Sequence, residues 1–142
     1  MKKVCSFLFI LLVILSLNSC SIDDGPNFNF VSLQIVSAEL PEAFDLNQTH
    51  EIRVTYLRPN GCTAFEGFDI GNPDATVRNV VAIGSSRTDQ VCEQSITEVD
   101  ASFQFVALFS ETYVFRFWTG EDADGNSQFL EIEVPVNNIP TN

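Results

Sequence analysis

The chain has 142 residues and carries 19 acidic side chains against 7 basic ones, for a formal net charge of −12. This excess of acid opposes binding to nucleic acid or to an anionic membrane surface, because like charges repel. The length suffices for one domain with a hydrophobic core.

The first twenty residues have the layout of an export signal. Lys2 and Lys3 precede an apolar run, Val4–Leu17, that only two serines interrupt. This run is shorter than the roughly 20 apolar residues that a membrane-spanning helix needs, so it indicates a cleavable signal peptide. We expect residues 1–19 to be removed, which leaves 142 − 19 = 123 residues without any lysine.

The tetrad Leu17-Asn18-Ser19-Cys20 ends this segment and resembles the lipobox of bacterial lipoproteins, in which a small residue precedes the cut and an obligatory cysteine follows it. The resemblance implies that the Cys20 sulfur carries diacylglycerol and that the new amino terminus is acylated, for example with palmitate. An ordinary signal peptide that happens to end near a cysteine is the alternative. Apart from this covalent lipid, no cofactor is expected.

Residues 20–27 are expected to form a flexible tether between lipid and domain, because they combine two adjacent acids with a Gly-Pro break. Asp23 and Asp24 resemble the acidic export signal of Bacteroidota surface lipoproteins, although Ile22 interrupts the cluster. The resemblance implies a lipid-anchored outer-membrane protein at the cell surface, with a periplasmic orientation as the alternative. By resemblance to other bacterial lipoproteins and their sorting rule, Ser21, rather than Asp, after the cysteine implies no retention at an inner membrane.

Two cysteines, Cys62 and Cys92, remain once the signal and the lipidated residue are set aside. In an exported protein they most simply form one disulfide. The bridge closes a loop of about 30 residues, worth roughly 3–4 kcal/mol on the chain-entropy estimate. A redox pair or a zinc site is the alternative, but zinc needs four ligands and the chain has a single histidine, His50.

From Phe28 onward the hydrophobic period is two, and no segment has a helical period. About seven short strands separated by Gly, Pro and Asn turns predict one antiparallel β-sandwich over residues 28–142. Phe44, Phe65 and Phe68 lie in or beside predicted loops, so an exposed aromatic patch is an alternative to core packing. The expected strands are 28–40, 50–57, 65–70, 76–83, 95–108 (one long strand, or two with a bulge near Asp100), 112–119 and 127–136.

The stretch Glu111–Trp118, followed by an acidic glycine turn and a last strand, resembles the closing hairpin of immunoglobulin-like and fibronectin-like modules. The resemblance implies an immunoglobulin-like sandwich in which Tyr113 occupies the tyrosine-corner position. The two cysteines lack the tryptophan that accompanies the antibody-domain disulfide, so theirs is a different bridge.

The turn of this hairpin invites a calcium interpretation. Asp122, Asp124, Asn126 and Glu131 offer closely spaced oxygen ligands around a glycine, as hard cations require. On the EF-hand template, however, Gly120 stands where the first ligand should be, and the flanks are strands. An acidic hairpin turn without metal explains the same residues.

Catalytic patterns are weak. His50 lies at the start of a strand, and the serines after Gly84 lack the second glycine of a nucleophile elbow. A hydrolase built on clustered carboxylates is an open alternative, since their separation cannot be read from the sequence. We expect no enzyme, and instead an interaction or accessory module with a protein partner in the envelope or outside the cell. The alternative is a calcium-dependent or glycan-binding module of an uptake or adhesion system.

Overall fold

The computed structural model describes residues 27–137. The predicted signal peptide (1–19), the lipid-bearing Cys20 and the acidic pair Asp23 and Asp24 lie outside the described residues. Within them, 68% of the residues are in strands and none is in a helix, which confirms the all-β prediction. This part of the chain holds no helix long and apolar enough to cross a membrane.

The described residues form ten strands, against about seven expected. The number rises because the first predicted strand divides at Gln34 and because two further strands have only two residues each. The strands are β1 (Phe28–Leu33), β2 (Ile35–Glu39), β3 (Phe44–Asp45), β4 (Thr49–Arg58), β5 (Thr63–Asp74), β6 (Val77–Arg87), β7 (Thr97–Val106), β8 (Tyr113–Glu121), β9 (Ser127–Val134) and β10 (Val136–Asn137).

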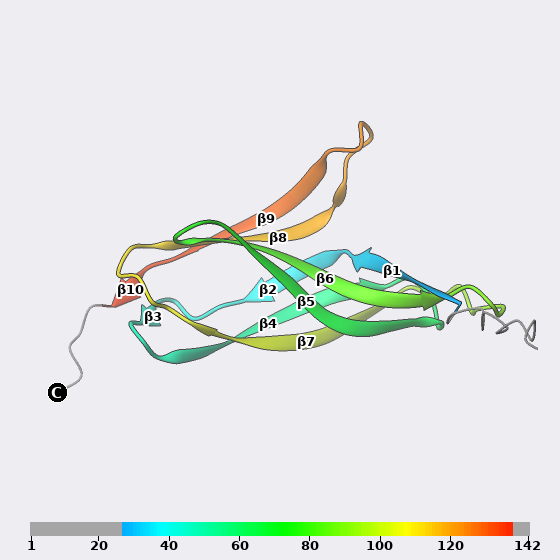
Figure 1. Ribbon diagram of the computed structural model, residues 1–142, viewed down its shortest axis with the longest axis horizontal. Coiled ribbons are helices and arrows are strands. Elements are labelled where there is room, and N and C mark those ends of the chain that lie inside the picture. Colours follow the sequence, from blue (N-terminus) through cyan, green and yellow to red (C-terminus); the bar gives the residue numbers. More distant parts are fainter. Residues whose placement is uncertain (1–26, 138–142) are drawn as a thin grey trace, which may run out of the picture.

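The strands form two larger sheets and one short pair (Figure 1). In the first sheet β6 is central, with β5 on one side and with β1 and β8 sharing the other side, where β1 pairs along residues 82–87 and β8 along residues 77–80. β9 pairs with β8. The second sheet has the order β2-β4-β7, and β3 pairs with β10. The chain thus crosses between the sheets at Gln34, between β1 and β2, and none of the sheets closes on itself.

Two pairings contradict the prediction of a purely antiparallel sandwich. β6 and β8 run parallel, with Val77 opposite Val114 and Val80 opposite Phe117, and β3 and β10 are parallel as well. Parallel neighbours need a crossover connection. β7, in the other sheet, lies on the path between β6 and β8. The period of a strand does not report the direction of its neighbour, so the sequence pattern could not reveal this arrangement.

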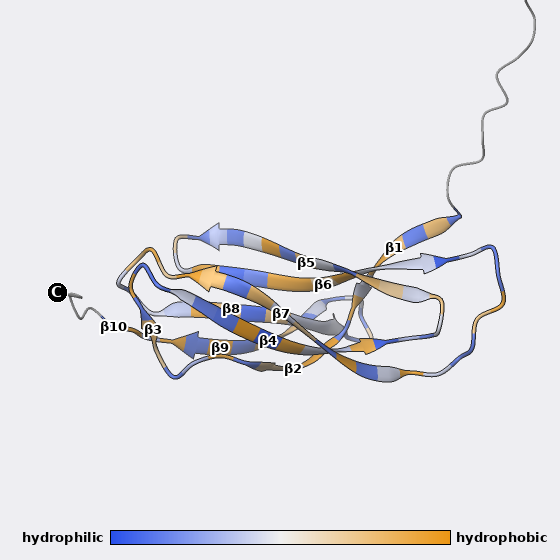
Figure 2. Cartoon of the chain, turned by 90° about the horizontal axis from the view of Figure 1, so that it is seen from below, coloured by the Kyte–Doolittle hydropathy of each residue, from blue (hydrophilic) through white to orange (hydrophobic). Residues whose placement is uncertain are grey.

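The core lies between the two sheets, and the strand period explains how it is filled. In β4 the predicted inward residues Ile52, Val54 and Tyr56 are at most 3% exposed, while the residues between them face outward. The aromatic residues of β8 alternate in the same way. Figure 2 shows this alternation of hydrophobic and hydrophilic residues along β4. A sandwich-like arrangement of this kind is what period two predicts.

Phe44, expected in or beside a loop between the predicted strands 28–40 and 50–57, lies in the core. It is fully buried, and its ring lies 5.1 Å from that of Phe105, 5.8 Å from that of Phe115 and 6.0 Å from that of Tyr113. The short pairing of β3 with β10 holds it there. Its neighbours in sequence are polar or small, so no periodic pattern marked it as a core residue. The alternative of an exposed aromatic patch is therefore wrong for Phe44.

Phe65 and Phe68 also pack against the core: both lie in β5 and are half-buried. The ring of Phe65 stacks on Tyr56 at 5.0 Å, and that of Phe68 lies 5.1 Å from Phe103. These contacts join the edge strand of the first sheet to the second sheet. The aromatic residues near predicted loops thus extend the core instead of forming a separate surface.

Tyr113 makes the contact expected of a tyrosine corner. Its ring is fully buried, and its hydroxyl accepts hydrogen bonds from the backbone N–H groups of Leu108 and Phe109, at 3.0 and 3.1 Å. The guanidinium carbon of Arg78 lies 5.2 Å from the centre of the same ring. The tyrosine therefore fixes the connection between β7 and β8 to the core.

Two strand boundaries differ from the prediction for identifiable reasons. β6 continues through Gly84 to Arg87 instead of ending at the glycine. A Cβ on Gly84 would lie 2.8 Å from the Ala64 carbonyl oxygen and 3.0 Å from Leu33, so the glycine allows close approach inside the sheet instead of ending the strand. β7 is a single strand whose register with β4 shows no bulge near Asp100.

Candidate functional site

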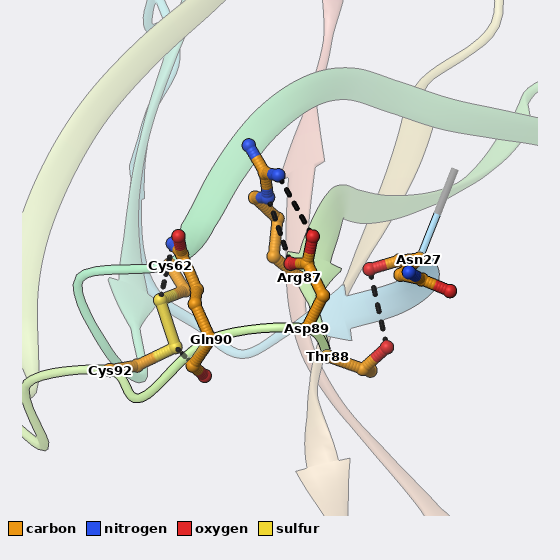
Figure 3. Close-up of polar contacts among 7 residues, drawn as sticks. All are labelled: Asn27, Cys62, Arg87, Thr88, Asp89, Gln90 and Cys92. Atoms are coloured by element: carbon orange, nitrogen blue, oxygen red, sulfur yellow. Dashed lines mark hydrogen bonds and ion pairs between the residues drawn. A yellow bond between two sulfur atoms is a disulfide. The ribbon is translucent and has the colours of Figure 1, made fainter.

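The predicted disulfide is present and lies at the end of the molecule where the described chain begins (Figure 3). It joins Cys62, in the turn between β4 and β5, to Cys92, in the connection between β6 and β7, with a Cα–Cα distance of 5.5 Å. The N–H of Gly61 also donates to the Glu93 carbonyl oxygen at 3.1 Å. The bridge therefore holds the irregular connection 88–96 against the body of the fold.

The same connection fixes the beginning of β1. The backbone N–H and the hydroxyl of Thr88 both donate to the carbonyl oxygen of Asn27, at 2.9 and 3.2 Å (Figure 3). The adjacent Arg87 pairs with Asp89 at 3.0 Å, and its hydrogen bonds hold the pKa of the Asp89 carboxyl below its ordinary value. The disulfide-bridged connection and the first described residues thus form one ordered unit, which we call the proximal end.

Apolar side chains lie exposed at this proximal end. Phe28 and Phe30 are on the same side of β1, 37% and 68% exposed, with ring centres 5.4 Å apart in an edge-to-face arrangement. Val91, three residues beyond Thr88, is fully exposed. The period of β1 predicted the alternation, but the sequence did not say which of its two faces is covered.

The outer face of the β2-β4-β7 sheet contains a half-open hollow of about 440 Å³, which we call the polar hollow. Its residues come from adjacent strands, with Arg53 opposite Glu39 on one side and Ser102 on the other. The hollow is lined by Glu39, Arg53, Thr55, Asp100, Ala101 and Ser102.

Hydrogen bonds order the side chains around the polar hollow. The Thr55 hydroxyl donates to Asp100 at 2.7 Å, and Glu51 accepts from the Ser102 hydroxyl at 2.9 Å and from Arg53 at 3.1 Å. These bonds, from Ser102 first and Arg53 second, lower the pKa of the Glu51 carboxyl. Carboxylate, hydroxyl and guanidinium groups on one rigid face can hydrogen-bond a polar ligand. The alternating polar positions were visible in the sequence, but which strands are neighbours was not.

The single tryptophan lies elsewhere. Trp118 borders a smaller hollow of about 270 Å³ between the β1–β2 junction and β8, beside Leu57 and Ile96. It is half-buried and does not line the polar hollow. No aromatic side chain of residues 27–137 lines the polar hollow, so a sugar bound there would rely on polar contacts instead of ring stacking.

The four residues of the calcium interpretation are not brought together. One Asp122 carboxylate oxygen accepts the backbone N–H groups of Asp124 and Asn126, both at 2.9 Å, which closes the turn. Glu131 instead pairs with Arg116 across the β8–β9 ladder at 2.8 Å. It stands five residues beyond Asn126 along β9, about 16 Å at the usual rise of a strand. Within residues 27–137, no group of three or more His, Cys, Asp or Glu side chains is placed to hold a metal ion.

The candidate catalytic residues have structural contacts. His50 Nε2 accepts the Asp45 backbone N–H at 2.9 Å, and its ring lies 5.0 Å from that of Phe44. The Ser85 hydroxyl, in the other sheet, donates to Glu66. The hydrogen bonds of the described residues do not join the histidine to this serine, so the geometry of a nucleophile and its base is not assembled from them.

Comparison of the chain with known protein families, with curated proteins and with solved structures gave no match.

Proposed function

We propose that this chain is a lipid-anchored, non-enzymatic protein of the bacterial outer membrane, displayed at the cell surface, whose single domain serves as an interaction or accessory module. The lipobox ending at Cys20 and the acidic pair Asp23 and Asp24 are the sequence features that favour it. Tyr113, with its hydroxyl bonded to the preceding loop, favours an immunoglobulin-like module, whereas the parallel pairing of β6 with β8 departs from a purely antiparallel sandwich.

The observation that carries the proposal is the position of Asn27. Asn27 lies 27 − 20 = 7 residues after Cys20, and its carbonyl oxygen is bonded by Thr88, on the connection that the disulfide holds. Seven residues span at most about 25 Å, so an anchor on Cys20 keeps the proximal end close to the membrane. A domain anchored at its proximal end can present the polar outer face of the β2-β4-β7 sheet to a partner.

Protease shaving of intact cells tests this function. The native protein is expected to be lost from intact cells on protease treatment, and an Asp23→Ala/Asp24→Ala variant to be protected. Asp122→Ala/Asp124→Ala, which removes an acidic pair from the distant β8–β9 turn, is the matched control and is expected to stay accessible. A Cys20→Ala variant is expected to lose its membrane association. Protection of the native protein would contradict surface display, and membrane retention of Cys20→Ala would contradict the lipid anchor.

A second candidate function is the capture of a hydroxyl-rich ligand such as a glycan, and the polar hollow is the observation that favours it. Arg53 and Thr55 offer donors at its centre, beside acceptors on β7. Binding of the native protein to an array of oligosaccharides, lost in Arg53→Ala/Thr55→Ala and kept in a Gln104→Ala control on the same sheet face, would support it. An array without signal for the native protein would contradict it.

A further inference from the structure

We propose that the proximal end docks directly on the lipid bilayer through Phe28 and Phe30, with Val91 as a third apolar contact. The inference rests on the proposed lipid anchor and deepens it, because it assigns the surface of the domain that meets the membrane. The body is then held in one orientation at the bilayer surface, with the polar hollow, on the outer face of the other sheet, left free for a partner.

The exposure and the geometry of Phe28 and Phe30 identify these residues as an apolar patch. Phe28 and Phe30 point to the same side of the strand and touch edge to face, so they present one continuous apolar surface. Phe30, at 68%, is the most exposed phenylalanine of the described chain. Phenylalanine in a strand normally fills the core, and a fully exposed Val91 on a disulfide-bridged connection adds a further apolar group at the same end.

The electrostatics of the segment distinguish it from the rest of an acidic protein. From Gly25 to Ala38 the chain carries no Asp, Glu, Lys or Arg, and this is the longest uncharged run after Cys20. Arg87, opposite Phe28, is paired with Asp89. Among the described residues, the charge beside Phe30 is that of Glu66, whose carboxylate accepts the hydroxyl of Ser85, opposite Phe30. An apolar, uncharged surface can approach lipid headgroups without the desolvation cost and repulsion that the acidic faces would meet.

The tether length selects lipid as the occupant. An anchor on Cys20 lies within about 25 Å of Asn27, whereas the opposite end of β4, a strand of 10 residues, is about 33 Å further along the body. A short tether raises the local concentration of a second contact to the millimolar range, so a weak interaction of two phenylalanine rings with the interface is sufficient for docking. Phe is among the side chains that interfacial segments bury at the boundary between headgroups and acyl chains.

Fluorescence quenching by lipid tests the docking. Mature protein is reconstituted in uncharged vesicles of phosphatidylcholine and phosphatidylethanolamine, with and without brominated acyl chains. The F30W substitution is made in a Trp118→Phe background, so that the indole at position 30 is the only one. The matched control places it at Phe109, 43% exposed at the other end of the body. We expect roughly twofold or greater quenching at position 30, because an interfacial indole reaches the bromines, and little at position 109.

Equal quenching at the two positions would overturn the inference. So would an emission shift at position 30 without quenching, since that indicates a protein partner or a second copy on the patch. Thermal unfolding checks each variant first, and F28W replaces F30W if the latter does not fold. The intact mass of the purified protein reports lipidation separately. An unlipidated chain overturns the proposed anchor, whereas a lipidated chain without quenching overturns the docking alone.

Discussion

The two ends of the body are closed by different means. At the distal end, where β3, β10 and the β7–β8 connection meet, Phe44 and Tyr113 are fully buried in a cluster of aromatic rings. At the proximal end the connection 88–96 has no regular structure, and a disulfide and the bonds of Thr88 to Asn27 hold it. One end is therefore stabilised by apolar burial. The other needs a covalent bond, and its apolar side chains remain on the surface.

Removing the centre of the distal cluster is expected to have the largest effect. Phe44→Ala deletes a fully buried ring that contacts both sheets, and such truncations cost about 3–5 kcal/mol of the free energy of unfolding. Urea denaturation measures it. Phe109→Ala, at a 43% exposed side chain of the same end, is the control and is expected to change little. Similar losses for the two variants would mean that the distal end is not held by burial.

The proximal end is expected to depend on its bridge almost as strongly. Cys62→Ala/Cys92→Ala opens a loop of sequence separation 30 and is expected to lower the free energy of unfolding by about 3–4 kcal/mol. A reductant should produce a similar loss in the native protein and none in the variant. If reduction leaves the urea midpoint unchanged, the bridge does not stabilise this end.

The tyrosine corner is expected to contribute less, through polar contacts. Tyr113→Phe leaves the Leu108 and Phe109 N–H groups without their acceptor, which costs about 1–3 kcal/mol for partly buried donors. Tyr56→Phe is the matched control, because no hydrogen bond of its hydroxyl is found within residues 27–137. Thermal unfolding compares the two, and equal shifts would show that the corner bonds carry no stability.

Acid is expected to weaken the proximal end and the β8–β9 turn modestly. The pKa of Asp89 is lowered chiefly by the Arg87 hydrogen bonds, and that of Asp122 by bonds from Asn126. A lowered folded-state pKa means that the stabilisation is present above the unfolded value, about 3.9, and is lost as the pH falls through the folded value. The urea midpoint should be flat near neutral pH and fall below about pH 4, with a smaller fall in Asp89→Asn. An unchanged acid profile in this variant would contradict the role of the pair.

Calcium is expected to have the smallest effect. The Asp122 carboxylate already closes its own turn, and Glu131 is paired with Arg116 on the ladder. Millimolar calcium should therefore leave the melting temperature unchanged in both the native protein and Asp122→Ala/Asp124→Ala. A rise that appears in the native protein and disappears in the variant would restore the calcium interpretation.

The sequence predicted the local features of the two ends, but not those that depend on long-range contacts. The disulfide followed from counting cysteines in a chain expected to be exported, and the closing hairpin and the β4 pattern followed from period two. The hairpin and the β4 pattern are local, and two cysteines can pair with each other in only one way. The burial of Phe44 and the parallel β6–β8 pairing depend on contacts between segments distant in sequence, which no local pattern encodes.

The polar hollow and the Phe28–Phe30 patch were missed for the same reason. Alternation shows that a strand has two faces, but it does not say which strands lie beside Arg53 or whether another layer covers Phe30. Both features become visible only once strand order is known.

The intact mass of the mature protein, extracted from membranes of the cells that make it, tests the central claim most directly. The account predicts a chain that begins at Cys20, lacks residues 1–19, and carries a diacylglycerol and an added acyl chain on that residue. A chain that begins elsewhere without lipid, or one that retains its first 19 residues, would contradict the anchor and with it the orientation of the two ends.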